Sequence, residues 1–174
     1  MSRRRLVWLA LAGVFLAGAI YTLYVSWRAE LLVVDSKANR ILLRAVVRPG
    51  DSFTLSYLHS VAKSRVTGAF KVTPAYEISV RETTFGSFGP GLPDVRPGDD
   101  YEVKGGLIRL KVNQTIPGLF FAVYPYTEHR LEIGGRTLDL SKVVVAGSRV
   151  AITVRPPLAH RLRQTFSDTP RLQP

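Results

Sequence analysis

The stretch "RILLRAVVRPGDSFTLSYLH", residues 40–59, decides the fold class. It holds two short apolar-rich runs, 40–47 and 52–59, of which the second alternates apolar and polar residues, separated by Pro49-Gly50-Asp51. A period of two is typical of a strand with one buried face, and a Pro-Gly-Asp cluster is typical of a turn. The stretch therefore predicts two strands joined by a turn.

The chain repeats this rhythm from residue 31 to residue 155. Ile108, Leu110 and Val112 alternate with basic residues, and Gly134-Gly135 separates two further runs as in a two-residue hairpin. No stretch after residue 30 has a convincing helical period. We therefore expect an all-β domain at 31–155, built as an antiparallel sandwich or small barrel. About nine strands are expected, at 40–47, 52–59, 66–72, 75–82, 107–112, 119–124, 130–133, 137–140 and 149–154.

The segment 6–27, "LVWLALAGVFLAGAIYTLYVSW", contains no charged residue. A helix of this length spans the hydrocarbon core of a bilayer, which is about 30 Å thick. The basic start, 1–5, is expected to stay in the cytoplasm, which places the β-domain outside the inner membrane of a bacterium as a single-pass protein. Ala17-Gly18-Ala19 also offers a cleavage site, but the apolar run continues to Trp27, so an anchor is favoured over a signal peptide.

Composition narrows the possible partners. The 174 residues include 24 Lys+Arg and 13 Asp+Glu, a formal net charge of +11, and no cysteine. The arginines are scattered and form no strip with interleaved aromatic residues, so nucleic-acid binding is not expected. Without cysteine the domain has neither a disulfide framework nor a lipoprotein anchor. The end of the chain, 156–174, is predicted to be a basic, flexible tail.

Two stretches contain the candidate functional residues, "YLHSVAKSRV" at 57–66 and "FGSFGPGLPD" at 85–94. Strand periodicity places Tyr57 and His59 on an inward face, and Glu82 on the inward face of 75–82. If the strands between them form a meander, His59 and Glu82 meet at one rim of the sheet. The pair either binds an anion, a metal ion or a partner's side chain, or closes the core as a hydrogen-bonded structural pair.

No catalytic or metal site is predicted. Ser60 directly follows His59, and neighbours on a strand face opposite ways, so they cannot act as nucleophile and base. The three histidines have no close ligand spacing, and His129, in line with Leu131 and Ile133, is expected to be a satisfied histidine at the rim. We expect no cofactor. The segment 84–106 is too rich in glycine and proline for a regular strand and is interpreted as a functional or disordered loop.

The blocks Tyr57-Leu58-His59-Ser60-Val61 and Ser87-Phe88-Gly89-Pro90-Gly91-Leu92-Pro93 resemble those of a bacterial family, domain of unknown function 1850. The resemblance covers roughly 40–130. It departs from the family at Val66-Thr67-Gly68, where members often carry an acidic residue. Members are often encoded beside transporters of the TRAP type, in their TAXI branch. The resemblance therefore implies an exported accessory protein whose partner is a transporter permease or its solute-binding protein.

Three functions remain open at this point. The first is a non-enzymatic, membrane-anchored accessory protein that docks on a transporter. The second is a small-ligand or anion-binding β-domain, with the glycine loop presenting backbone N–H groups as a nest. The third is a hydrolase acting on envelope material. The candidate docking or binding residues are Tyr57, His59, Ser60, Glu82, Ser87, Phe88, Gly89, Gly91, Leu92 and Pro93.

Overall fold

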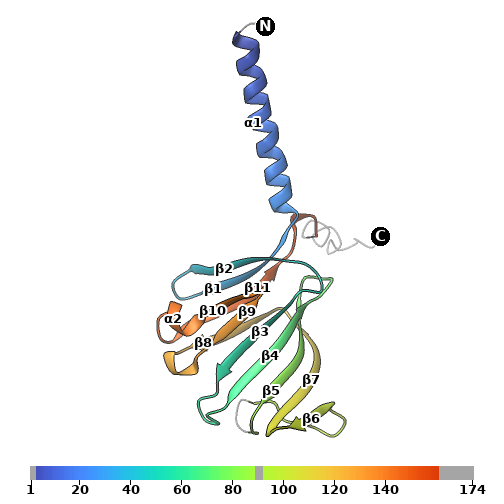
Figure 1. The fold of residues 1–174 in the computed structure, drawn as a ribbon, viewed down its shortest axis with the longest axis vertical. Coiled ribbons are helices and arrows are strands. Elements are labelled where there is room, and N and C mark those ends of the chain that lie inside the picture. Colours follow the sequence, from blue (N-terminus) through green and yellow to red (C-terminus); the bar gives the residue numbers. More distant parts are fainter. Residues whose placement is uncertain (1–2, 89–91, 161–174) are drawn as a thin grey trace, which may run out of the picture. The chain divides into compact units, whose positions relative to one another are not determined.

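The computed structural model describes residues 3–88 and 92–160 (Figure 1). The chain divides into two compact units. One is the β-domain, Glu30–Arg155, and the other combines Met1–Ala29 with Pro156–Pro174. Most of the tail predicted for 156–174 lies outside the described residues.

The predicted N-terminal apolar helix is confirmed as α1, Arg3–Ser26. Its segment Arg3–Tyr24 has a mean hydropathy of 2.1 and none of it is buried within the protein. A helix that is apolar all round and unburied is stable only in lipid or against a partner. Its length and composition fit a single-pass anchor or a signal sequence.

The β-domain consists of two antiparallel sheets that do not close into a barrel, so the prediction of a sandwich is confirmed. The four-stranded sheet has the order β2 (Arg40–Val47), β1 (Ala29–Asp35), β11 (Ser148–Arg155) and β8 (Gly118–Val123). The seven-stranded sheet has the order β10 (Arg136–Asp139), β9 (Arg130–Ile133), β3 (Ser52–Leu58), β4 (Arg65–Val72), β5 (Ile78–Phe85), β7 (Leu107–Ile116) and β6 (Tyr101–Lys104). Two single turns of helix, η1 (Pro125–Thr127) and α2 (Leu140–Val143), complete the domain.

The described residues form eleven strands rather than about nine. The two that the sequence missed are β1, whose apolar run does not alternate, and β6, which lies in the glycine-rich segment 84–106. Gly105 and Gly106 join β6 to β7 with φ angles of 59° and 76°. Two successive left-handed residues match the twist of a tight hairpin, and only glycine adopts them freely.

Strand β5 contains the main correction to the predicted site. It begins at Ile78, three residues later than predicted, and its pairing with β4 skips one residue, since Ala69 lies opposite Glu82 and Phe70 opposite Val80. The extra residue, Arg81, is a β-bulge, and a bulge reverses which side chains face inward beyond it. Thr83 and Phe85 are therefore opposite Leu110 and Ile108 on the buried side, and Glu82 points outward.

The inner face of the large sheet is covered in two parts. The four-stranded sheet covers one part, where Phe53 and Phe70 stack with ring centroids 5.1 Å apart. The loop after β5 covers the other part, where its Leu92 joins a cluster of buried side chains from β4, β5 and β7. That cluster consists of Val66, Phe85, Leu92, Ile108 and Leu110.

Candidate functional site

A cavity of about 630 Å³ opens where these two coverings meet. Its walls come from β3, β4 and β5 of the large sheet, from β8 of the small sheet and from the η1 segment. Volumes of this size accommodate a small molecule. Among the described residues that line it, none is Asp, Glu, Lys or Arg. The aromatic and imidazole side chains of the lining are Tyr57, His59, Phe70, Phe120, Phe121, Tyr124, Tyr126 and His129.

His129 occupies the centre of a ring stack that joins the two sheets. Its imidazole lies 5.2 Å from the Tyr57 ring on β3 and 4.8 Å from the Phe121 ring on β8, measured between centroids. Both pairs are nearly parallel, with interplanar angles of 16° and 15°. Such aromatic pairs contribute about 0.5–1.5 kcal/mol each beyond their buried area. The stack therefore holds the sandwich together beside the cavity.

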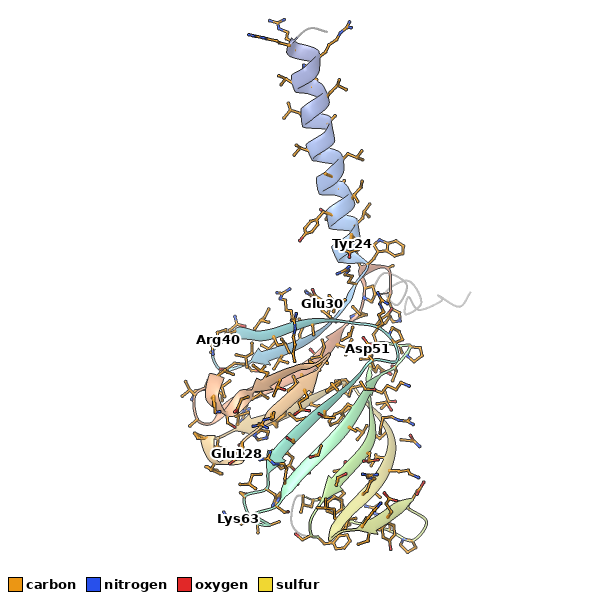
Figure 2. The ribbon with its side chains drawn as sticks, viewed as in Figure 1. Tyr24, Glu30, Arg40, Asp51, Lys63 and Glu128 are labelled. Carbon is orange, nitrogen blue, oxygen red and sulfur yellow. The ribbon has the colours of Figure 1, made fainter. Side chains whose placement is uncertain are left out.

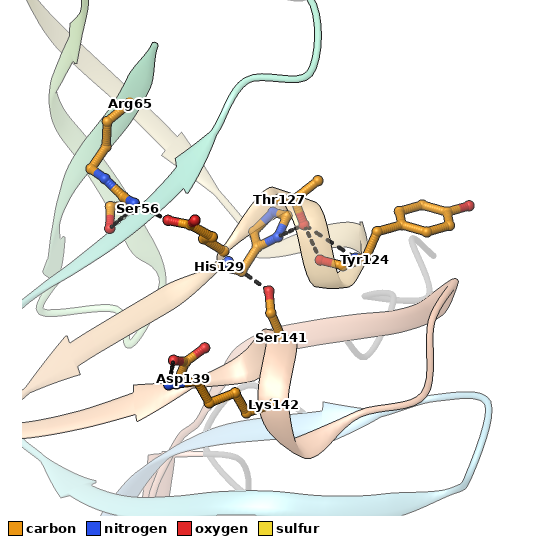
Figure 3. Close-up of polar contacts among 9 residues, drawn as sticks. Ser56, Arg65, Tyr124, Thr127, His129, Asp139, Ser141 and Lys142 are labelled. Carbon is orange, nitrogen blue, oxygen red and sulfur yellow. Dashed lines mark hydrogen bonds and ion pairs between the residues drawn. The ribbon is translucent and has the colours of Figure 1, made fainter. Parts of the chain in front are cut away.

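The η1 turn fixes how His129 enters this stack. Pro125 begins the turn, and Glu128 ends it in the left-handed conformation, with φ 45°. The Thr127 hydroxyl donates to the Tyr124 carbonyl oxygen at 2.6 Å and lies 2.7 Å from Nδ1 of His129 (Figure 3). Because the single hydroxyl proton goes to the carbonyl, we assign the ring proton to Nδ1, which donates to Thr127. Nε2 is then the unprotonated ring nitrogen.

Burial also determines the charge of His129. Its side chain is only 5% exposed, and its surroundings are two aromatic rings and neutral hydroxyl groups. Desolvation lowers the pKa of His129 from 6.5 to about 4, because burial penalises the charged imidazolium. Burial also raises the pKa of Tyr57, so that its phenol remains a hydrogen-bond donor. The cavity wall is therefore neutral at physiological pH on this side.

His59 lies at the end of β3 and has the opposite ring tautomer. Its Nδ1 accepts the backbone N–H of Ala62 at 3.0 Å, so the ring proton is on Nε2. The backbone of His59 also bonds to Ser64 and Lys63, which closes the 59–64 turn. Two imidazoles of one cavity wall thus present a donor, Nε2–H of His59, and an acceptor, Nε2 of His129.

The two blocks singled out in the sequence meet beside the cavity. Tyr57, His59 and Ser60 of the first block and Pro93 of the second line it. Gly86, just before the second block, packs closely on the first turn, since an added Cβ would lie 3.1 Å from Cβ of Ser64. The two stretches therefore lie side by side.

The remaining predicted residues have other surroundings. Leu92 is buried in the core, and Phe88 contacts the edge of Phe85 at 5.9 Å between centroids while remaining 53% exposed. Ser87 is half-buried, and Gly89 and Gly91 lie outside the described residues.

The predicted meeting of His59 and Glu82 is wrong. The bulge at Arg81 turns Glu82 to the outer face of the sheet, where its carboxylate lies 3.1 Å from the Arg109 guanidinium. His59 is on the inner side, and its hydrogen-bond partners are backbone groups of its own turn. In the described part of the chain, no group of three or more His, Asp or Glu side chains is placed to hold a metal ion.

The sequence reasoning missed the contribution of β8 and η1 to the site. Phe121, Tyr124, Tyr126 and Thr127 all line the cavity, together with His129. The concentration of aromatic residues in "YPYTEH", 124–129, was a usable signal. The prediction that His129 is a satisfied rim histidine is confirmed by its hydrogen bonds to Thr127 and Ser141.

Comparison with known families gives one result. The family described as a domain of unknown function, DUF1850, matches residues 53–140, which is just over half of the chain. The chain belongs to this family. No curated protein and no solved structure matches it. The DUF1850 match begins in β3 and extends to the end of β10. It includes His129 and the loop that contains Pro93. It therefore includes every described residue that lines the cavity.

Proposed function

We propose that this DUF1850 protein is a membrane-anchored extracytoplasmic β-sandwich that binds an uncharged, largely apolar small molecule between its sheets. The observation that carries the proposal is the cavity of about 630 Å³ whose described lining contains aromatic and aliphatic side chains and no formal charge. Few, well-placed polar groups in an apolar cavity are typical of small-molecule sites. Here the two imidazoles supply one donor and one acceptor, which suits a ligand with a hydroxyl or amide group.

An anionic ligand is less well supported. Anion sites use cationic side chains, helix N-termini or nests of backbone N–H groups. None of the described lining residues is Lys or Arg, and His129 is held neutral by burial. The glycine nest considered for the second block centres on residues 89–91, which lie outside the described residues. A binding measurement with neutral and anionic probes can therefore distinguish the two classes of ligand.

The test is a thermal-shift titration of the full chain in lipid nanodiscs. The probes are indole and 4-ethylphenol as neutral aromatic molecules, with acetate and phosphate as anions. A ligand present at about 100 times its Kd stabilises the folded state by about 2.7 kcal/mol, which gives a shift of several degrees. We expect at least one neutral probe to raise Tm and both anions to have no effect.

A matched pair of variants assigns the effect to the cavity. Thr83→Phe fills space inside, because Thr83 lines the cavity. Thr84→Phe places the same ring one residue later on the outward face of β5. The proposal predicts that only Thr83→Phe abolishes the shift. A flat response of the wild type to the neutral probes, or a shift that survives Thr83→Phe, would refute it.

A transporter accessory role is a second proposal, favoured by the exposed aromatic side chains at the cavity. Phe120 is 68% exposed and Tyr126 is 59% exposed, and Tyr126 stacks on Tyr124 at 5.3 Å between centroids. Exposed aromatic groups of this kind often mark a protein contact. Pull-down of the solubilised full chain from its host tests this role. Recovery of a permease or solute-binding protein by wild type and by Glu82→Gln, but not by Tyr126→Ser, would support it, and equal recovery by all three would refute it.

A further inference from the structure

The outer face of the four-stranded sheet is strongly basic. Strand pairing places Leu31, Val33 and Ile152 on its buried side, so the alternate residues of β1, β2, β11 and β8 point outward. This outward side and its flanking turns carry six basic side chains. Glu30 is the one acidic residue on the outer face of these strands, and Asp51 lies in the turn after β2; both are labelled in Figure 2 together with Arg40. The six are Lys37, Arg40, Arg44, Arg48, Arg149 and Arg155.

This charge is not balanced within the sheet. The carboxylate of Glu30 is shared between Arg155 and Arg44, whose guanidinium lies 3.6 Å away. In the part of the chain that the structure describes, the side chains of Arg48 and Arg149 form no ion pair with a carboxylate. Unpaired arginines on one face produce a local positive potential that attracts anions.

The seven-stranded sheet carries more carboxylates on its outer side. On its outer side Arg109 lies 3.1 Å from both Glu82 and Glu102, and Lys111 lies 2.8 Å from Asp100. Three of this sheet's basic side chains, Arg65, Arg109 and Lys111, are thus paired with carboxylates. The smaller sheet, in contrast, has a single carboxylate, that of Glu30, on the outer face of its strands.

Exposed apolar groups accompany the arginines. Val46 on β2 is 53% exposed and Phe120 on β8 is 68% exposed, and both belong to the outward set of their strands. A surface that combines arginine with exposed aliphatic and aromatic groups suits the boundary between lipid headgroups and acyl chains. A nucleic acid or an acidic protein would need the charge but not these apolar groups.

The connection between α1 and this sheet is short. Only Trp27 and Arg28 separate the end of α1 from the start of β1. Two intervening residues span at most about 10 Å between flanking Cα atoms. The Arg28 guanidinium lies 3.7 Å over the Tyr24 ring, and such aromatic and basic residues concentrate where a spanning helix leaves the bilayer.

We infer that the outer face of the four-stranded sheet docks on the anionic headgroups of the membrane in which α1 is anchored. This inference depends on α1 acting as the anchor and not on a ligand in the cavity, although Phe120 belongs to both the docking face and the cavity lining. Each basic residue near an anionic surface contributes to attraction, and the attraction falls with salt within a Debye length. Docking of this kind fixes which side of the domain faces away from the membrane.

The test uses the absence of cysteine, which allows a single label at a chosen position. Val46→Cys reports on the basic face, and Val103→Cys is its control, an exposed valine on β6 of the other sheet with 64% exposure. Each full-length variant carries a bimane label in vesicles that contain nitroxide-headgroup lipid as quencher. The vesicles are phosphatidylcholine with or without about 30% phosphatidylglycerol. The two kinds of vesicle therefore differ in the charge of the membrane surface, while the anchored protein is the same. Ala151→Cys on β11 gives a second label on the same face.

We expect quenching at position 46 to exceed that at position 103 several-fold in the anionic vesicles, and to fall without phosphatidylglycerol or in about 0.5 M salt. The double variant Arg48→Gln/Arg149→Gln should lower the docked-to-free ratio about tenfold, whereas Arg81→Gln/Arg130→Gln, on the other sheet, should leave it unchanged. Equal quenching at both labels would overturn the inference. Quenching at position 46 that does not change with lipid charge, with salt or in the Arg48→Gln/Arg149→Gln variant would also overturn it. Such quenching would be explained by the short connection between α1 and β1 alone.

Discussion

Acidification should destabilise this domain through His129, and the size of the effect follows from its burial. The folded-state pKa of His129 is about 4, against 6.5 for an exposed histidine. Between these values the unfolded chain binds a proton that the folded chain does not, so stability falls as pH decreases. The contribution is fully present above about pH 6.5 and is lost at about 1.4 kcal/mol per pH unit below it. From about pH 7.5 to about pH 4.5 the loss is about 2.5 kcal/mol.

The variant His129→Phe isolates this contribution. A phenyl ring preserves the stack with Tyr57 and Phe121 but cannot titrate, and it gives up the hydrogen bond to Thr127. Losing that bond costs about 1 kcal/mol at neutral pH. The wild type should therefore be the more stable protein at about pH 7.5, and the variant the more stable at about pH 4.5. Other titrating groups affect both proteins alike, so the two stability curves should cross between about pH 5 and pH 6.

Urea unfolding of both full-length proteins in nanodiscs, followed by near-UV circular dichroism of the tyrosines, measures this crossing. An NMR titration of the His129 ring measures its pKa directly. Parallel stability curves across this pH range, or a ring that titrates near 6.5, would refute the reasoning. A refutation would mean that solvent reaches the imidazole and that the ring stack is open in solution.

Three further predictions concern residues outside the stack. Glu82→Gln should change the free energy of unfolding by less than about 0.5 kcal/mol in urea titrations, because its ion pair with Arg109 is exposed to solvent; a loss above 2 kcal/mol would show that the carboxylate is not on the outer face. Asp35→Ala should cost about 1–3 kcal/mol, and Asp35→Asn less, because this buried carboxylate accepts two backbone N–H groups of the β1–β2 turn; equal losses would contradict that role. Leu92→Ala should cost about 2–4 kcal/mol and expose the β5–β7 amides to hydrogen exchange, since Leu92 covers that core; unchanged exchange would mean that the loop is not a cover.

The sequence predicted the strands well where short apolar runs end at turn residues. Runs 40–47 and 130–133 match β2 and β9 to the residue, and Gly134-Gly135 forms the predicted hairpin turn with φ angles of 55° and 73°. These features are local, because alternation and the glycine pair act within a few residues. Local patterns of this kind can be recognised without knowledge of the fold.

The site was less predictable because its geometry depends on longer-range features. A period of two predicts which side chains point inward only as far as the first extra residue in the strand. The local sequence "SVRE" contains no feature that predicts the bulge at Arg81. The ring stack joins Tyr57 and Phe121, residues of different sheets that only the pairing of β8 with β11 brings together. Inward direction could be predicted for His59 and His129 separately, but their common cavity required the packed sandwich.

The distribution of charge separates three environments on one small domain. The outer side of the seven-stranded sheet has several paired charges, as at Arg109. The outer side of the four-stranded sheet has unpaired arginines, and the cavity between the sheets has no described charged lining at all. The net charge of +11 is therefore unevenly distributed, with one basic face and one cavity whose described lining is uncharged. Since the two sites share no charged side chain, salt should weaken docking and leave ligand binding unchanged, so each proposal can fail without the other.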